Sequence, residues 1–122
     1  MTKTEALQKW FDGFGIKAYP ASAVPDDATF PYLTYEPVIA AFGEGEVNCT
    51  VNLWYYTSSE SIPNAKAEEI GKAVGLGGVR IKCDDGLIWI KRGSPFCQNV
   101  AYEQDTSIKR RYINLDIEYI AY

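Results

Sequence analysis

The stretch that decides the fold is Val47-Asn-Cys-Thr-Val-Asn-Leu-Trp-Tyr-Tyr56. Its odd positions are apolar, whereas its even positions are polar at first and aromatic toward the end. Successive side chains of a strand point to opposite faces, so ten residues of strict alternation predict a long strand. The apolar face belongs to a core. The aromatic end of the other face leads us to expect that part of that face is covered too.

A helix is predicted on each side of this strand. Thr2 and Glu5 have the spacing of a capping box, and apolar residues follow at helical spacing from Leu7 to Phe14. Gly13 and Gly15 are expected to end this helix. After the strand, Pro63 suits a first helical turn, and a second helix is expected to reach about Val74.

The second half of the chain has the pattern of antiparallel strands. Segments 79–83 and 87–92 flank Asp85-Gly86, a dipeptide typical of a two-residue type I′ turn. That turn would pair Lys82 with Trp89. Segment 96–102 and a long terminal segment, 108–121, read as further strands. Before the central strand, residues 16–19 and the segment after Pro31 predict short strands, the latter limited to a strand start or an edge.

These elements predict a single α+β domain over residues 1–122. We expect a mainly antiparallel, mixed-order sheet of about five to six strands, with two helices packed on one face. A chain of 122 residues is one domain's worth, and its 47% hydrophobic content suits a packed core.

The expected setting is a reducing cytoplasm. No apolar run approaches the roughly 18 residues of a membrane span, and residues 1–5 lack a signal-peptide pattern. We therefore expect no membrane partner. The three cysteines, Cys49, Cys83 and Cys97, have no C-x-x-C spacing and are interpreted as small buried hydrophobic residues.

The sequence offers little for catalysis. It contains no histidine, which excludes His-based triads and the commonest zinc sites, and it has no phosphate-binding glycine motif. Neighbouring carboxylates occur chiefly in predicted turns, where Asp has local structural reasons to occur. We therefore expect no enzyme, no metal and no cofactor.

Basic residues give the best candidate binding face. The predicted hairpin places Arg80, Lys82, Trp89 and Lys91 on one face, and Lys109, Arg110 and Arg111 form a second basic group. Basic residues around an aromatic ring can bind a nucleotide or an acidic peptide. The other interpretation is a solvated hairpin face in which the Lys82 stem shields Trp89.

Charge and aromatic residues are unevenly distributed. Residues 1–60 contain three lysines and eight acidic residues, a net charge of −5. Residues 61–122 contain nine basic and eight acidic residues, a net charge of +1. Tyrosine occurs nine times, and Tyr or Trp crowds several predicted outer faces, at positions 54, 56, 89, 112 and 122. Tyr, Trp and Arg are enriched at protein interfaces, which suggests self-association.

The order of elements resembles the tail-terminator and related neck proteins of long-tailed bacteriophages. The features that carry the resemblance are an amphipathic helix ending near Phe14-Gly15, then Phe30-Pro-Tyr-Leu-Thr-Tyr35, the central strand and the helix at 65–74. A hairpin, the 93–102 segment and the strand Arg111-Tyr-Ile-Asn-Leu-Asp-Ile-Glu-Tyr119 follow. Minor capsid proteins of similar size in phages of Gram-positive hosts look much the same.

The resemblance implies a structural virion subunit of a ring, typically six-fold, that caps the tail tube and joins it to the head. Its implied partners are copies of itself, the tail-tube protein, a head-completion or connector protein, and DNA that passes through the lumen without specific binding. The subunit would be assembled in the host bacterial cytoplasm and end in the virion neck. We expect an acidic lumen wall to be supplied by the following residues: Asp26, Asp27, Glu36, Glu44 and Glu46.

Two alternatives remain open. One is a head-completion or minor capsid role within the same class of structural proteins. The other is a small α+β binding module that takes a nucleotide or an acidic peptide on the Lys82/Trp89 face.

Overall fold

The computed structural model describes all of residues 1–122 and contains two helices and six strands. In chain order these are α1 (Lys3–Asp12), β1 (Lys17–Pro20), the 3₁₀ turn η1 (Ala21–Ala23), β2 (Tyr32–Tyr35), β3 (Glu46–Tyr56), α2 (Ser61–Val74), β4 (Val79–Cys83), β5 (Gly86–Ala101) and β6 (Ile108–Ala121). Neither helix is long and apolar enough to cross a membrane.

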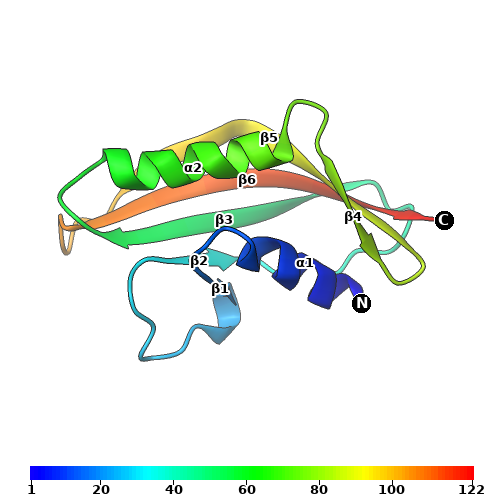
Figure 1. The fold of residues 1–122 in the computed structure, drawn as a ribbon, viewed down its shortest axis with the longest axis horizontal. Coiled ribbons are helices and arrows are strands. Elements are labelled where there is room, and N and C mark those ends of the chain that lie inside the picture. Colours follow the sequence, from blue (N-terminus) through cyan, green and yellow to red (C-terminus); the bar gives the residue numbers. More distant parts are fainter.

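The strands form one sheet in the order β1-β2-β3-β6-β5-β4. Only β1 and β2 pair in parallel, and every other neighbouring pair is antiparallel. Both helices lie on the same face of this sheet, so the opposite face carries no second layer (Figure 1). The predicted α+β class, the mainly antiparallel sheet and the two helices on one face are confirmed.

The pairing of β3 with β6 forms the centre of the sheet. It runs without interruption from Glu46↔Glu118 to Tyr56↔Ile108, so the two strands present their side chains to the same two faces in step. Cys49, Val51 and Leu53 of β3 are fully buried, and so are Ile113 and Leu115 opposite them on β6. The helix-covered face of this pair is the core, as the alternation of residues 47–56 predicts.

Helix α1 is held at its N-terminal end and along its buried side. The capping box is present: the Glu5 amide donates to Thr2 Oγ1 (3.1 Å) and the Thr2 amide donates to Glu5 Oε1 (3.0 Å). The bond from the Thr2 amide, followed by that from the Thr2 hydroxyl, lowers the pKa of the Glu5 carboxyl group. Phe11 is fully buried and stacks on Tyr35, with ring centroids 4.4 Å apart. The helix contacts both outermost strands, β1 and β4, so the sheet curls around it.

The β4–β5 turn differs from its prediction. Cys83 pairs with Gly86 and Arg80 pairs with Trp89, so the two turn residues are Asp84 and Asp85, not Asp85 and Gly86. Of these residues only Asp85 has a positive φ, of 67°, which excludes a type I′ turn. Gly86 has a different role. A Cβ there would lie 2.2 Å from the Ile120 carbonyl oxygen, so the glycine allows β5 to approach β6 closely.

Two segments that were predicted as separate strands form a single strand. Segments 87–92 and 96–102 belong to the single strand β5, whose register with β6 shifts between Arg92 and Cys97. An irregularity of this kind bends a strand without ending it. At the bend the Asn114 side-chain amide donates to the Pro95 carbonyl (3.0 Å), which holds the extra residues against β6.

Burial of tyrosine and cysteine side chains makes the stability of the fold sensitive to alkaline pH. Burial raises the pKa of Tyr35, Tyr119 and Cys49 to about 12 in each case. In the unfolded chain a tyrosine ionises near pH 10 and a cysteine near 8.5. The unfolded state therefore loses protons first, and the free energy of unfolding falls as pH rises from about 9 toward 12.

Urea unfolding between about pH 8 and about pH 11 measures this loss, and Tyr35→Phe is expected to make it shallower because one titrating group is gone. A stability that is constant over this range, or equally steep in the variant, would contradict the assignment.

Candidate functional site

The candidate site lies on the face of the sheet that no helix covers, here called the open face. Even-numbered positions of β3 and β6 point to it, because their odd-numbered partners form the core. Aromatic side chains gather at the end of this face where β3 ends and β6 begins. We call the following set the aromatic patch: Tyr19, Phe30, Tyr32, Trp54, Tyr56, Tyr102, Arg110 and Tyr112.

Tyr32 is the centre of the patch. Its ring lies 6.0 Å from that of Tyr19, 5.4 Å from that of Phe30 and 6.4 Å from that of Trp54, measured between centroids. Trp54 is its direct neighbour across the β2–β3 pair. Phe30 continues the contact to Tyr56, 5.8 Å away. Such spacings are those of interacting aromatic pairs, so the rings form one continuous surface.

Arg110 extends this surface onto β6. Its guanidinium carbon lies 5.1 Å from the Trp54 ring centroid and 5.9 Å from that of Tyr112. Its Nε donates to Asn52 Oδ1 (2.7 Å), which fixes the side chain flat against the sheet. A guanidinium held over aromatic faces is a typical contact residue of protein interfaces.

The patch is accessible although its rings shield one another. Tyr56 is 60% exposed and Phe30 is 38% exposed, while Trp54 and Tyr32 are half-buried. We expected part of this face of β3 to be covered. Only the neighbouring rings of the same chain cover it. The Trp54 indole N–H donates to Thr34 Oγ1 (3.1 Å), so its polar atom is satisfied without a partner molecule. What remains for a partner is apolar ring surface.

The predicted basic hairpin face lies at the other end of the open face. The Arg80 guanidinium is 4.5 Å and Lys91 Nζ is 3.8 Å from the Trp89 ring centroid, and the indole N–H donates to the Gly77 carbonyl (3.0 Å). Lys91 is paired with Glu46 and Glu118, and the bond to Glu46 is the main cause of its raised pKa. Trp89 is therefore already occupied by groups of its own chain.

Lys82 does not contact Trp89 as the predicted register required. It pairs with Leu87 and lines a groove between α1 and β4. Lys82 and Arg80 are exposed and form no salt bridge within the chain.

The second predicted basic group is divided by strand alternation. Lys109 donates to the nearby Thr106 carbonyl, Arg110 lies on the open face and Arg111 lies in the core. From Arg110 to Glu118, which pairs with Trp89, there are eight residues of β6, or about 26 Å at about 3.3 Å per residue. The two basic groups therefore do not form one binding face.

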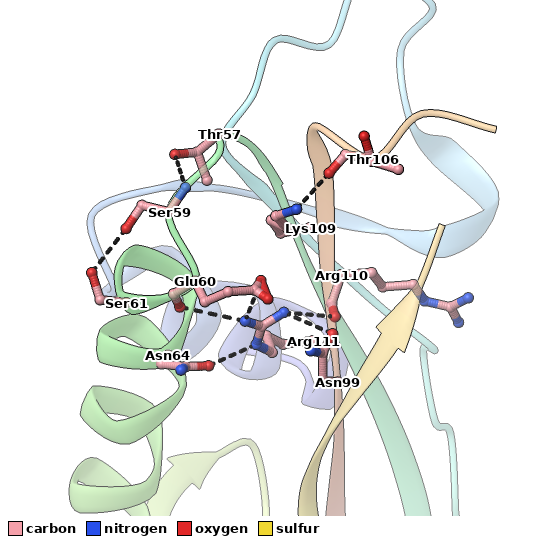
Figure 2. Close-up of polar contacts among 10 residues, drawn as sticks. All are labelled: Thr57, Ser59, Glu60, Ser61, Asn64, Asn99, Thr106, Lys109, Arg110 and Arg111. Carbon is pink, nitrogen blue, oxygen red and sulfur yellow. Dashed lines mark hydrogen bonds and ion pairs between the residues drawn. The ribbon is translucent and has the colours of Figure 1, made fainter. Parts of the chain in front are cut away.

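Arg111 is a structural residue, not a surface one. It is only 2% exposed, and Figure 2 shows its guanidinium directed toward the start of α2, whereas Arg110 points the other way. It donates to Asn64 Oδ1 (2.8 Å), Asn99 Oδ1 (3.0 Å) and Glu60 Oε1 (3.2 Å). It thus joins α2 to β5 and β6. Extending the alternation from Ile113 one step back would have predicted its burial.

The acidic residues expected at a lumen are spread along β3. Asp26 and Asp27 lie in the loop before β2. The first residue of β2 pairs with Trp54, near the end of β3. Glu44 and Glu46 lie at the start of β3. Figure 1 shows these two regions at opposite ends of the molecule. Glu36, just after β2, lies between them. The five carboxylates therefore do not form one cluster in a single chain, and no group of His, Cys, Asp or Glu gathers where it could hold a metal ion.

The aromatic patch includes residues that sequence reasoning did not connect. Trp54, Tyr56 and Tyr112 were expected on outer faces, but Tyr19, Phe30 and Tyr102 join them only through tertiary structure. Tyr19 arrives through the parallel β1–β2 pair, which no local pattern predicts, and Phe30, two residues before β2, meets Tyr56 beside the β2–β3 pair. Tyr102 was predictable as the end of a strand, but not its 6.3 Å contact with Trp54.

Comparison of the chain with protein-family models, with curated proteins and with solved structures finds no match in any of the three.

Replacing Arg111 tests its structural role. Arg111→Ala removes the hydrogen bonds that join β6 to α2 and β5 and leaves a cavity, so we expect it to lower the free energy of unfolding by about 2–4 kcal/mol. Its neighbour is the control, because Arg110→Ala removes an arginine from the open face and should cost less than about 1 kcal/mol. Denaturant unfolding of both variants measures the difference, and equal effects would show that Arg111 does not hold the layers together.

Proposed function

We propose that this protein is a structural virion-assembly subunit, which forms an oligomeric ring at the neck of a long-tailed bacteriophage, caps the tail tube and joins it to the head. The observation that carries the proposal is the aromatic patch on a sheet face that no helix covers. A surface of this kind is suited to being covered by another protein chain.

The composition of the patch favours a protein partner. Tyr, Trp, Phe and Arg are the residues enriched at protein interfaces, and large aromatic anchors contribute most of the binding energy there. Lys17 and Arg110 supply positive charge near the patch, but the adjoining loops carry Asp26, Asp27 and Glu103. Local charge is therefore not strongly positive, unlike the grooves that bind nucleic acid strands.

The order of elements supports the place of this subunit in a virion. The helix, short strands, long strand, helix and strand run resemble tail-terminator and neck proteins over nearly the whole chain. In this proposal the partners are copies of the chain, the tail-tube protein and a head-completion or connector protein, met in the host cytoplasm during assembly. The open face supports a head-completion or minor capsid role equally, because those roles also need a surface that another chain covers.

An acidic lumen remains part of the proposal in a narrower form. Of the five acids, Asp26 and Asp27 lie together in one exposed loop and form no salt bridge, whereas Glu46 is paired with Lys91. An unpaired acidic loop repels the DNA backbone, so the Asp26–Asp27 loop is the part of the chain that suits a wall along which DNA slides.

Self-assembly is the first test of this proposal. Native mass spectrometry from about 1 μM to about 1 mM protein, with negative-stain electron microscopy, should show one discrete closed oligomer, expected to be six-fold. Tyr56→Lys and Phe30→Lys place a charge in the aromatic patch and should weaken assembly, or stacking of rings, at least about tenfold.

The matched control is Ile62→Lys, which makes a similar change at an exposed position on α2, where the residue is 51% exposed. It should leave assembly unchanged. A wild-type protein that stays monomeric over the whole concentration range would overturn the proposed ring. Equal weakening of assembly by all three variants would show that the aromatic patch is not part of the interface.

A further inference from the structure

One large apolar side chain has no cover in its own chain. Leu76 is 97% exposed, the highest value among the large hydrophobic residues. It lies in the loop Gly75-Leu-Gly-Gly78, between α2 and β4, and Figure 1 shows this loop projecting beyond the helix and the sheet. Gly77 has open space around its α-carbon. The leucine thus stands on a narrow glycine loop that another surface can approach closely.

An unfilled apolar groove lies elsewhere on the same chain. It runs between α1 and β4, has a volume of about 750 Å³ and is lined mainly by apolar side chains. Ala6 and Trp10 come from α1, Ile81 and Cys83 come from β4, and Tyr122, which is 79% exposed, follows β6. Lys9, Lys82 and Asp84 add polar groups to the lining. A groove of this size can hold a short loop with its side chain.

Leu76 does not reach the groove of its own chain. It precedes the first residue of β4 by three positions, whereas Cys83 and Asp84 of the groove lie at the other end of that strand. The strand alone spans about 13 Å from Val79 to Cys83, at about 3.3 Å per residue, and Leu76 lies in the loop before Val79. The exposed leucine and the apolar groove are therefore separate surfaces, held apart by the strand between them.

We propose that Leu76 of one copy inserts into the α1–β4 groove of the next copy, and that this is a contact of the ring. The inference rests on the proposed self-assembly and names the contact and its partner, a second copy of this chain. Because one surface of each copy meets a different surface of the next, the contact is heterologous, and such contacts close into a ring when the rotation between copies allows it. The inserted leucine removes from water the most exposed apolar side chain of the protein, and the groove excludes water in turn.

Two half-defective variants test this contact. Leu76→Asp keeps the groove but replaces the apolar side chain, and Lys9→Trp keeps Leu76 but fills the groove from an exposed position of α1. Each variant alone should be monomeric at concentrations where the wild type forms the closed oligomer, with assembly weakened at least about tenfold.

An equimolar mixture of the two variants distinguishes this contact from others. One intact leucine and one intact groove remain per pair, so the mixture should form a heterodimer and nothing larger, as read by native mass spectrometry. The controls Ile62→Asp and Glu68→Trp make the same kinds of change on the exposed side of α2 and should assemble as the wild type does. Recovery of association in the mixture also shows that both variants are folded.

The outcomes separate this inference from the proposed function. Closed oligomers that form normally with both half-defective variants would overturn the leucine-in-groove contact and leave the ring intact. Loss of assembly in Leu76→Asp alone, with Lys9→Trp unaffected, would also overturn it, since Leu76 would then insert elsewhere. A wild type that never self-associates would overturn the proposed function together with the inference.

Discussion

The structure depends on the uninterrupted register between β3 and β6. Eleven paired positions, from Glu46↔Glu118 to Tyr56↔Ile108, fix which side chains face the helices and which face outward. A slip of one residue would place Trp54 and Arg110 in the core and Leu53 and Arg111 in water. The apolar core, the buried arginine network and the aromatic patch on the open face are thus three consequences of one alignment, and none of them can change without the other two.

Much of the fold follows from local pattern, and the differences have tertiary causes. The alternation of 47–56 and the capping box of α1 were sufficient to place β3 and the first helix. The β4–β5 turn was misplaced because an Asp-Gly dipeptide is typical of a two-residue turn. Gly86 is instead required because a side chain there would collide with the Ile120 carbonyl. Arg111 was misplaced because three adjacent basic residues look like a surface run, although strand alternation puts every second one inside.

The candidate site was less predictable than the fold because it crosses strands that are distant in sequence. Aromatic residues on the outer faces of single strands are visible in the sequence, but the strand order is not, and it is the order β1-β2-β3-β6 that brings Tyr19, Tyr32 and Trp54 to one end of the sheet. The register of β5 with β6 separates the basic residues around Trp89 from Arg110 along the strand. Composition therefore predicted a protein interface, whereas the location of the aromatic patch depends on the topology.

A two-layer fold with one open face gives the chain surfaces that point in different directions. Leu76 lies in the loop before β4, the groove is lined by the strand from Ile81 onward, and β4 is held to β5 by five paired positions. The direction from the loop that carries Leu76 to the groove is therefore set by a strand of the sheet. A fixed angle between two unlike surfaces repeats at each contact, which is the geometric condition for a ring of defined size. The aromatic patch lies on neither of these two surfaces, so in the proposed assembly it would supply a separate contact, between copies or between stacked rings.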